Sequence, residues 1–233
     1  MLRLTEIRLP LDHAPDDLRY AVLRQLGIPG NDLISVDIFR RGYDARKKSS
    51  IHFIYTLDVE IKDEAAWLGR QDPRTRKQIF PTPDYRYRLV GHAASPPDLR
   101  PVVVGTGPCG LFAGLLLAQM GFLPIILERC KKVRERTRDT FGLWRQGRLD
   151  PESNVQFGEG GAGTFSDGKL HSQISDPRHY GRKVLEEFVK AGAPQEIQWI
   201  NRPHIGTFRL VGMVERMRAE IIELGGEIRF ESK

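Results

Sequence analysis

The sequence of 233 residues predicts an α/β protein with a small N-terminal unit, a connector and a larger C-terminal unit. The first observation behind this prediction is that residues 1–68 carry three segments of alternating apolar and polar residues around one amphipathic helix. The second is a β-branched run that begins at residue 102 and passes through a glycine-rich turn into an apolar helix. Residues 69–99 are rich in proline and lack a sustained period, which is typical of a connector. We therefore expect domains at residues 1–68 and 100–233.

The N-terminal unit is predicted to contain one helix and three strands. Residues 2–11 alternate with one slip and form the first strand. The helix spans residues 14–28, because Pro15 and two acidic residues lie in its first turn and Gly27 ends its apolar stripe. Alternation then predicts strands at residues 34–38 and 51–61. The resulting order, β-α-β-β, is that of a ferredoxin-like unit.

A basic segment, RRGYDARKKSS, lies between the last two of these strands at residues 40–50. The whole chain has a net charge of +6, and a positive surface attracts nucleic acids and anionic metabolites alike. We interpret the segment as a solvated hairpin tip in preference to a nucleic-acid contact, because solvated charge runs are the commoner case.

The composition excludes several classes of protein. With 40% apolar and 28% charged residues the chain is globular, and no run approaches the roughly 18–20 apolar residues of a membrane helix. The N-terminus scatters charges where a secretory signal would be apolar, so we expect a cytoplasmic protein without a membrane partner. The two cysteines, Cys109 and Cys130, form no CxxC or zinc motif. We therefore expect no metal site, and any redox chemistry requires a bound cofactor.

The turn GTGPCG, residues 105–110, has the spacing of a dinucleotide-binding motif. Gly105 would make the sharp turn, Gly107 would let the backbone approach a pyrophosphate, and Gly110 would let the helix pack close to the strand. The free N–H groups at the helix start attract an anion, and Pro108 is tolerated there because an N–H in the first turn has no intrahelical partner. The turn therefore predicts a Rossmann-like domain.

The next strand ends in Glu128, and this position supports the same prediction. Glu128 follows Gly110 by 18 residues, close to the roughly 20 expected for the acid that binds the ribose hydroxyls. Its charge argues against a 2′-phosphate in this site, because two negative groups repel each other. Cys109 lies at the helix start, where a thiolate is favoured, but we interpret it as a small residue packed beside the cofactor.

A second glycine-rich segment, NVQFGEGGAGTFSDGKL, occupies residues 154–170. Its glycines suit neither helix nor strand and indicate a loop that passes close to a flat or anionic group. Together with VVVGTGPCGLFAGLLLA, ILER and RPHIGTFRL, the segment resembles the two-dinucleotide-domain flavoproteins of the glutathione-reductase type, and among them bacterial FAD-dependent dehydrogenases. The resemblance covers nearly all of residues 100–233, and the N-terminal unit, with DARKK before its long strand, is similar to the unit preceding the flavin domain in this group.

This resemblance implies that the cofactor is FAD and that the activity is that of an oxidoreductase acting on a small molecule. NADH or NADPH is a candidate electron donor. It further implies that the glycine turn holds the pyrophosphate, that Glu128 holds the adenosine ribose and that the second loop lies along the flavin. The implied cofactor-binding residues are Gly105, Gly107, Pro108, Cys109, Gly110, Glu128, Arg129, Gly160, Gly161, Ala162, Gly163 and Thr164.

Two residues are candidates for a catalytic role. Lys169 follows the second glycine loop, where its charge would stabilise a reduced flavin ring. His204 lies in the RPHIGT segment of the resemblance and is preferred to His171 and His179, since histidine titrates near neutral pH and each of the three could carry a proton.

The flavoproteins of this type are longer than this chain, so we expect it to be an N-terminal part that binds FAD weakly by itself. Two alternatives stay open. One is an NAD-binding dehydrogenase that uses the same glycine turn. The other is a basic module on residues 1–68 that binds RNA or another polyanion. The patterns identify neither the substrate nor the oligomeric state.

Overall fold

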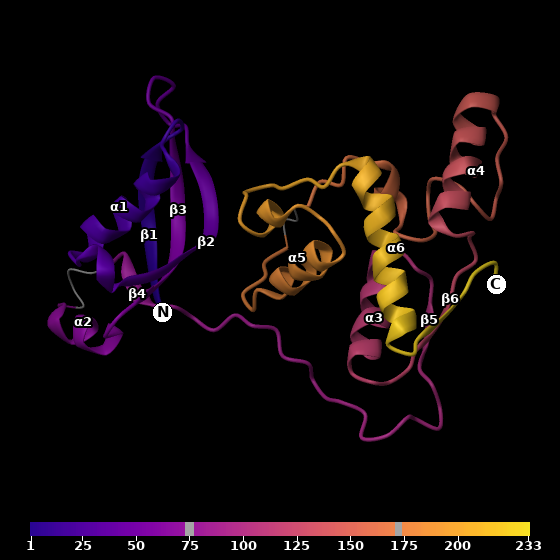
Figure 1. Cartoon of the computed structure of the whole chain (residues 1–233). Coiled ribbons are helices and arrows are strands. Elements are labelled where there is room, and N and C mark those ends of the chain that lie inside the picture. Colours follow the sequence, from indigo (N-terminus) through magenta and orange to yellow (C-terminus); the bar gives the residue numbers. More distant parts are fainter. Residues whose placement is uncertain (73–76, 171–173) are drawn as a thin grey trace. The chain divides into compact units, whose positions relative to one another are not determined.

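The computed structural model describes residues 1–72, 77–170 and 174–233. They form two compact units, one of Met1–Tyr85 with Gln198–Asn201 and one of Arg86–Ile197 with Arg202–Lys233 (Figure 1). The first unit contains an antiparallel sheet of four strands and the second a parallel sheet of three. The predicted mixed α/β class is confirmed.

The first unit extends the predicted β-α-β-β order by one helix and one strand. Its elements are β1 (Leu2–Pro10), α1 (Pro15–Leu26), a short 3-10 helix (Gly30–Asp32), β2 (Leu33–Asp44), β3 (His52–Ile61), α2 (Glu64–Arg70) and β4 (Ile79–Pro81). The sheet order is β2-β3-β1-β4 with antiparallel neighbours throughout, which is the order of a split βαβ unit. Both α2 and β4 reach into residues 69–99, where the sequence predicts a connector.

The slip in the first alternating segment is a β-bulge. Leu2 and Leu4 are buried in the core, and so are Ile7 and Leu9, although the two pairs are out of phase by one residue. The register against β3 shifts between Leu4 and Ile7, and Glu6 has a φ of 60°. The extra residue returns the apolar side chains to the same face of the sheet.

A second register shift changes the alternation predicted for residues 34–38. The shift lies between Leu33 and Ser35, so Leu33 is buried while Ile34 is 54% exposed. Val36 and Ile38 pack against the core, as alternation predicts. The prediction that Ile34 shares their face is wrong, because the irregular pairing at the strand start turns its side chain outward.

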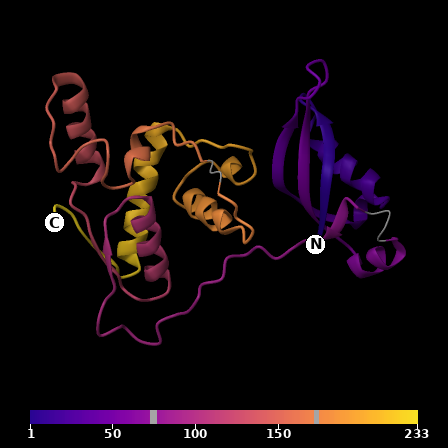
Figure 2. The same cartoon turned by 180° about the vertical axis from the view of Figure 1, so that it is seen from behind.

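The second unit has two helices and three parallel strands at its centre. Its elements are β5 (Val102–Val104), α3 (Pro108–Gln119), β6 (Ile125–Leu127), α4 (Val133–Gln146), a 3-10 helix (Ala162–Phe165), α5 (Tyr180–Lys190), a 3-10 helix that ends at the first unit's boundary (Gln195–Gln198), α6 (Thr207–Glu223) and β7 (Glu227–Arg229). The strand order is β5-β6-β7, and α3 and α6 lie together on one side of the sheet (Figures 1 and 2). Helices α4 and α5 are not predicted by the patterns described above.

Two observations bear on the excluded classes. Within residues 1–72, 77–170 and 174–233, none of the helices is both long enough and apolar enough to cross a membrane. The same described residues contain no group of three or more His, Cys, Asp or Glu side chains that could hold a metal ion.

Candidate functional site

The glycine turn joins the end of β5 to the start of α3. Gly105 has a φ of 90°, a conformation that favours glycine, and its N–H donates to the Leu127 carbonyl at 2.7 Å. Gly107 is the N-cap of α3, with a φ of −61°, and its carbonyl accepts from Leu111 N–H at 2.9 Å. The turn is thus held against the end of β6, and the first turn of α3 begins immediately beyond it.

The last glycine of the motif permits close packing of α3 on the turn. A Cβ atom at Gly110 would overlap the carbonyl oxygen of Gly105 and lie 3.6 Å from Val103 Cγ1. One turn further along α3, a Cβ atom at Gly114 would overlap Ile126 Cδ1 on β6. Both glycines therefore allow the helix to approach the sheet, which is the role predicted for Gly110.

Glu128, directly after β6, holds the glycine turn in place. Its Oε2 accepts from the backbone N–H of Thr106 at 2.7 Å and from the Thr106 hydroxyl at 2.5 Å. Its Oε1 accepts from Cys130 N–H at 2.7 Å, and the residue is 2% exposed. A carboxylate can accept about four hydrogen bonds, so Oε1 retains capacity for one more donor.

The second glycine loop lies against the first, although the two are about 50 residues apart in the sequence. Gly160 N–H donates to the Thr106 carbonyl at 2.9 Å. Gly161 has a φ of 70°, and a Cβ atom there would lie 2.7 Å from Pro108 Cδ. The structure therefore brings the two predicted glycine segments together at the start of α3.

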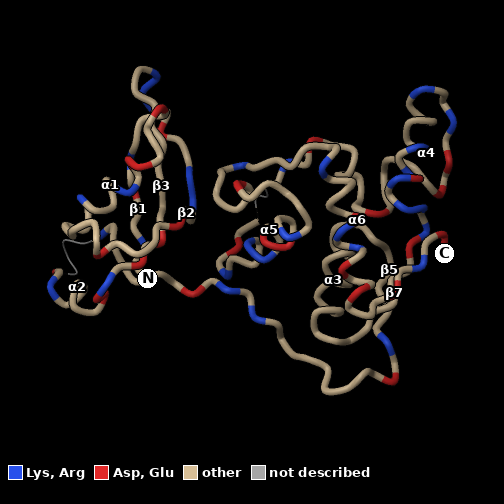
Figure 3. Tube along the Cα trace, viewed as in Figure 1, with Lys and Arg blue, Asp and Glu red and all other residues tan. Residues whose placement is uncertain are grey.

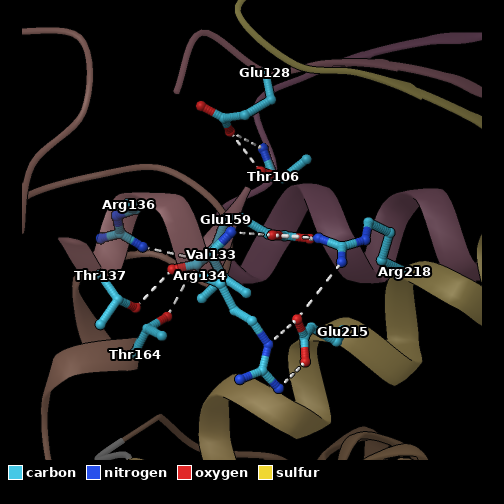
Figure 4. A network of polar contacts seen from close by, with 10 residues as sticks. All are labelled: Thr106, Glu128, Val133, Arg134, Arg136, Thr137, Glu159, Thr164, Glu215 and Arg218. Atoms are coloured by element: carbon cyan, nitrogen blue, oxygen red, sulfur yellow. Dashed lines mark hydrogen bonds and ion pairs between the residues drawn. The ribbon is translucent and has the colours of Figure 1, made fainter. Parts of the chain in front are cut away.

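A buried arginine from α4 organises the second loop. The Arg136 side chain is 0% exposed and donates to the carbonyls of Asn154 (2.9 Å), Val155 (3.2 Å), Glu159 (2.8 Å) and Gly161 (3.0 Å). Figure 4 shows its position in the polar network around this loop. Sequence reasoning missed Arg136, because it is one of several arginines in a segment whose composition is typical of the solvent-exposed face of a helix.

Glu159 connects the same loop to two helices. The residue is fully buried, and its carboxylate accepts from Val133 N–H and from Arg218 Nη1, each at 2.7 Å (Figure 4). Burial raises the pKa of Glu159, while the charge of Arg218 opposes that rise. Sequence reasoning also missed Glu159 and Arg218. The sequence feature that could have indicated a structural role for Glu159 is its place as a single carboxylate within a run of glycines.

A cavity of about 930 Å³ opens where these elements meet. The exposed Arg129 lies on its wall, with its guanidinium 4.3 Å from the centre of the Phe157 ring and 3.0 Å from Glu152 Oε2. Seven residues of the predicted cofactor set line the cavity. They are Gly105, Gly107, Pro108, Glu128, Arg129, Gly161 and Ala162.

A second, smaller cavity of about 250 Å³ lies between α3, α5 and α6. It shares Pro108 with the first cavity and has an apolar wall that includes Phe112 and Phe188. The members of the predicted set that line it are Pro108, Gly160, Gly163 and Thr164. In the described part of the chain, Cys109 and Gly110 belong to the first turn of α3 but to the lining of neither cavity.

The two catalytic candidates lie side by side. Lys169 and His204 form an isolated antiparallel bridge, and Lys169 lines the smaller cavity. The Lys169 side chain is 70% exposed, and its Nζ lies 3.8 Å from Asp167. His179 is the N-cap of α5, away from this bridge in the sequence, and His171 lies outside the described residues.

The basic segment of the first unit forms the tip of the β2–β3 hairpin, where Lys and Arg gather in Figure 3. Strand β2 includes Arg40 and Arg41, so the tip is shorter than predicted. Arg46 donates to both oxygens of Asp44, at 2.8 and 2.6 Å, and these bonds hold the pKa of Asp44 well below its ordinary value. One of the basic side chains is therefore paired within the hairpin itself.

The two cysteines are expected to differ in reactivity. Cys109 is exposed, whereas Cys130 is buried with its thiol 3.5 Å from Ser153 Oγ, and burial raises the pKa of Cys130. Because the thiolate is the reactive form, we expect a disulfide reagent at pH 8 to titrate one thiol rapidly in the folded chain and two in denaturant. The variant Cys109→Ser should lose the rapid reaction, and a fast reaction in that variant would contradict the burial of Cys130.

Two comparisons with known proteins are informative. Residues 1–60 match the model of a family described as a domain of unknown function (DUF8436). The chain is also similar, with 42% identity over 232 residues, to an uncharacterized protein of Clostridium beijerinckii (strain ATCC 51743 / NCIMB 8052). That match includes 100% of this chain, and the chain spans 43% of the length of the relative. More than half of the relative therefore lies outside the similar region.

Proposed function

We propose that this chain is the N-terminal part of an FAD-dependent oxidoreductase and that its second unit is a Rossmann-like domain holding the cofactor. The observation that carries the proposal is the buried carboxylate of Glu128, fixed against the glycine turn at the wall of a 930 Å³ cavity. The parallel order β5-β6-β7 supports it, since three consecutive strands of a doubly wound fold are arranged in this order.

The residues at the first cavity suit the adenosine and pyrophosphate of a dinucleotide. Among the residues that the structure describes, none would place an atom within 4 Å of a Cβ atom at Gly107, so the backbone there faces space that a diphosphate could occupy. The N-terminus of α3 points its dipole and N–H groups toward an anion in that position. Oε1 of Glu128 could accept from a ribose hydroxyl, whereas a phosphate at this position would be repelled.

The second loop favours FAD over NAD as the occupant. It adds a second set of glycines beside Pro108, and its residues line both the larger and the smaller cavity. A flavin supplies two-electron redox chemistry when bound, and the protein supplies binding, orientation and electrostatics. In this arrangement Lys169, at the smaller cavity, would contribute a positive charge, and His204 beside it a group that can carry a proton.

The direct test is the visible absorbance spectrum of the C. beijerinckii relative at its full length, with the released cofactor identified by mass. We expect a flavin spectrum and FAD in the supernatant after denaturation. Release of NAD without a flavin band would instead favour the NAD-binding dehydrogenase. The same measurement on the 233-residue chain should show weak or no FAD retention.

A substitution at Gly107 should separate binding from folding. We expect Gly107→Thr to leave the unfolding free energy within about 0.5 kcal/mol of the parent, because Thr is about as good an N-cap as Gly and nothing lies within 4 Å. In the full-length relative, threonine at the position aligned with Gly107 should lower FAD affinity, measured by fluorescence quenching, at least about tenfold, since the side chain enters the space of the pyrophosphate. The matched control, threonine at the position aligned with Gly42 in β2, should leave the affinity of the relative unchanged. Equal FAD affinity of the relative with and without threonine at the Gly107 position would argue against a dinucleotide at this turn.

A further inference from the structure

The two faces of the parallel sheet have different surroundings. On one face, Val103, Ile126 and Ile228 form a row across the three strands, because the register pairs residue 103 with 126 and 126 with 228. All three belong to the core formed with α3 and α6, and Ile126 is 0% exposed. This face is covered within the chain.

The opposite face is formed by the alternate residues of each strand. One row contains Val102 and Ile125, and the next contains Val104 and Leu127. Val102 is 58% exposed and Val104 is 86% exposed. Strand β5 of this parallel sheet therefore exposes its apolar side chains to solvent on this face.

The apolar surface has a polar border. Each row continues onto β7, where Glu227 follows Ile125 and Arg229 follows Leu127. The Arg229 Nε atom donates to Glu227 Oε1 at 2.7 Å, so these two charges satisfy each other at the surface. The apolar area therefore lies over β5 and β6, and β5 is, like β7, an edge strand of the sheet.

We propose that the β5–β6 surface, made of Val102, Val104, Ile125 and Leu127, is the docking surface for a further segment of a longer polypeptide. All-parallel sheets occur almost entirely with both faces covered, and strands with continuous apolar runs are typical of that arrangement. The relative from C. beijerinckii supplies the required length, since this chain spans 43% of it. The segment presents apolar side chains to β5 and β6 and ends at the Glu227–Arg229 pair. Val104 and Leu127 also line the larger cavity, whereas Val102 lies outside its lining, so a substitution at Val102 tests this surface separately from the proposed cofactor.

The proposal predicts that charge on this surface is harmless in the 233-residue chain and harmful in the longer polypeptide. In the chain, Val102→Lys should leave thermal stability unchanged and lower the binding of an apolar dye at least about twofold, because it places a charge on an exposed apolar patch. The control Val90→Lys, at a connector residue that is 91% exposed, should not change dye binding. In the full-length relative, lysine at the position aligned with Val102 should lower the Tm by at least about 5 °C, because the charge would be buried.

Several results would overturn the proposal. An unchanged Tm in the lysine variant of the full-length relative would show that the position is not covered. If that variant fails to fold, threonine at the same position should still lower the Tm measurably, and no change would have the same meaning. Sedimentation of the 233-residue chain as a dimer that Val102→Lys dissociates would make a second copy the occupant instead.

Discussion

Replacement of Gly110 by alanine is expected to destabilise the second unit by about 3 kcal/mol, because overpacking at a site without free volume forces the backbone to move. The added methyl group would overlap the carbonyl oxygen of Gly105, which is backbone and cannot rotate away. To make room for this methyl group, helix α3 would have to move away from both the glycine turn and the sheet. Since the chain has two units, the effect is measured by hydrogen exchange of the peptide spanning residues 102–127 in native conditions.

Gly142→Ala provides the matched control for this substitution. Gly142 also lies inside a helix of the second unit, but a Cβ atom there would meet no atom of the described residues within 4 Å. We expect this variant to be more stable by about 0.5–1 kcal/mol, because alanine loses less backbone entropy on folding than glycine. If the amides of residues 102–127 exchange equally slowly in the Gly110→Ala and Gly142→Ala variants, the close approach of α3 to the turn is not a constraint on this fold.

The substitution Arg136→Met is expected to lower the stability of the second unit by about 3–5 kcal/mol, because each buried carbonyl left without a donor costs about 1–3 kcal/mol. Four carbonyl groups, those of Asn154, Val155, Glu159 and Gly161, would lose their donor in a buried site. Arg136→Lys should be intermediate, because an ammonium group lacks the planar fork that reaches several acceptors. Unfolding in urea and amide exchange of residues 154–165 measure the two effects.

Arg138→Met is the control, since Arg138 is an exposed residue two positions further along α4. Surface substitutions of this kind usually change stability by less than about 0.5 kcal/mol. Equal stability of the Arg136 and Arg138 variants, together with equal amide exchange of residues 154–165, would contradict the assignment of the second loop to Arg136. Faster exchange confined to residues 154–165 in Arg136→Met would support it even if global stability changed little.

The glycine segments could be predicted from the sequence because their geometry restricts the residue type. Gly105 and Gly161 have positive φ values, and Gly110 has no room for a side chain, so few other residues could occupy these positions. The alternation of β1 and β3 was equally informative, because a strand with one buried face repeats every second residue. Whether this turn and loop hold FAD stays a prediction.

Sequence reasoning missed the polar interior of the second unit. Its charged residues, Arg136, Glu159 and Arg218, are of types that usually lie on a surface. Only the folded chain shows that Arg218 pairs with the Glu159 carboxylate and that Arg136 donates to carbonyls of the second loop. Their burial depends on contacts between segments far apart in the chain, about which local periodicity carries no information. The shift at Ile34 was missed for a related reason, because register depends on the partner strand.

The four hydrogen bonds from Arg136 also bear on affinity. A loop that becomes ordered only when a ligand arrives loses conformational entropy at that moment, and affinity falls accordingly. Here the loop carbonyls are anchored by a side chain of the same unit, so that loss accompanies folding instead. Residues 154–161 are therefore held in place by the folded unit itself, and we expect a molecule that enters the cavity to order little of this wall.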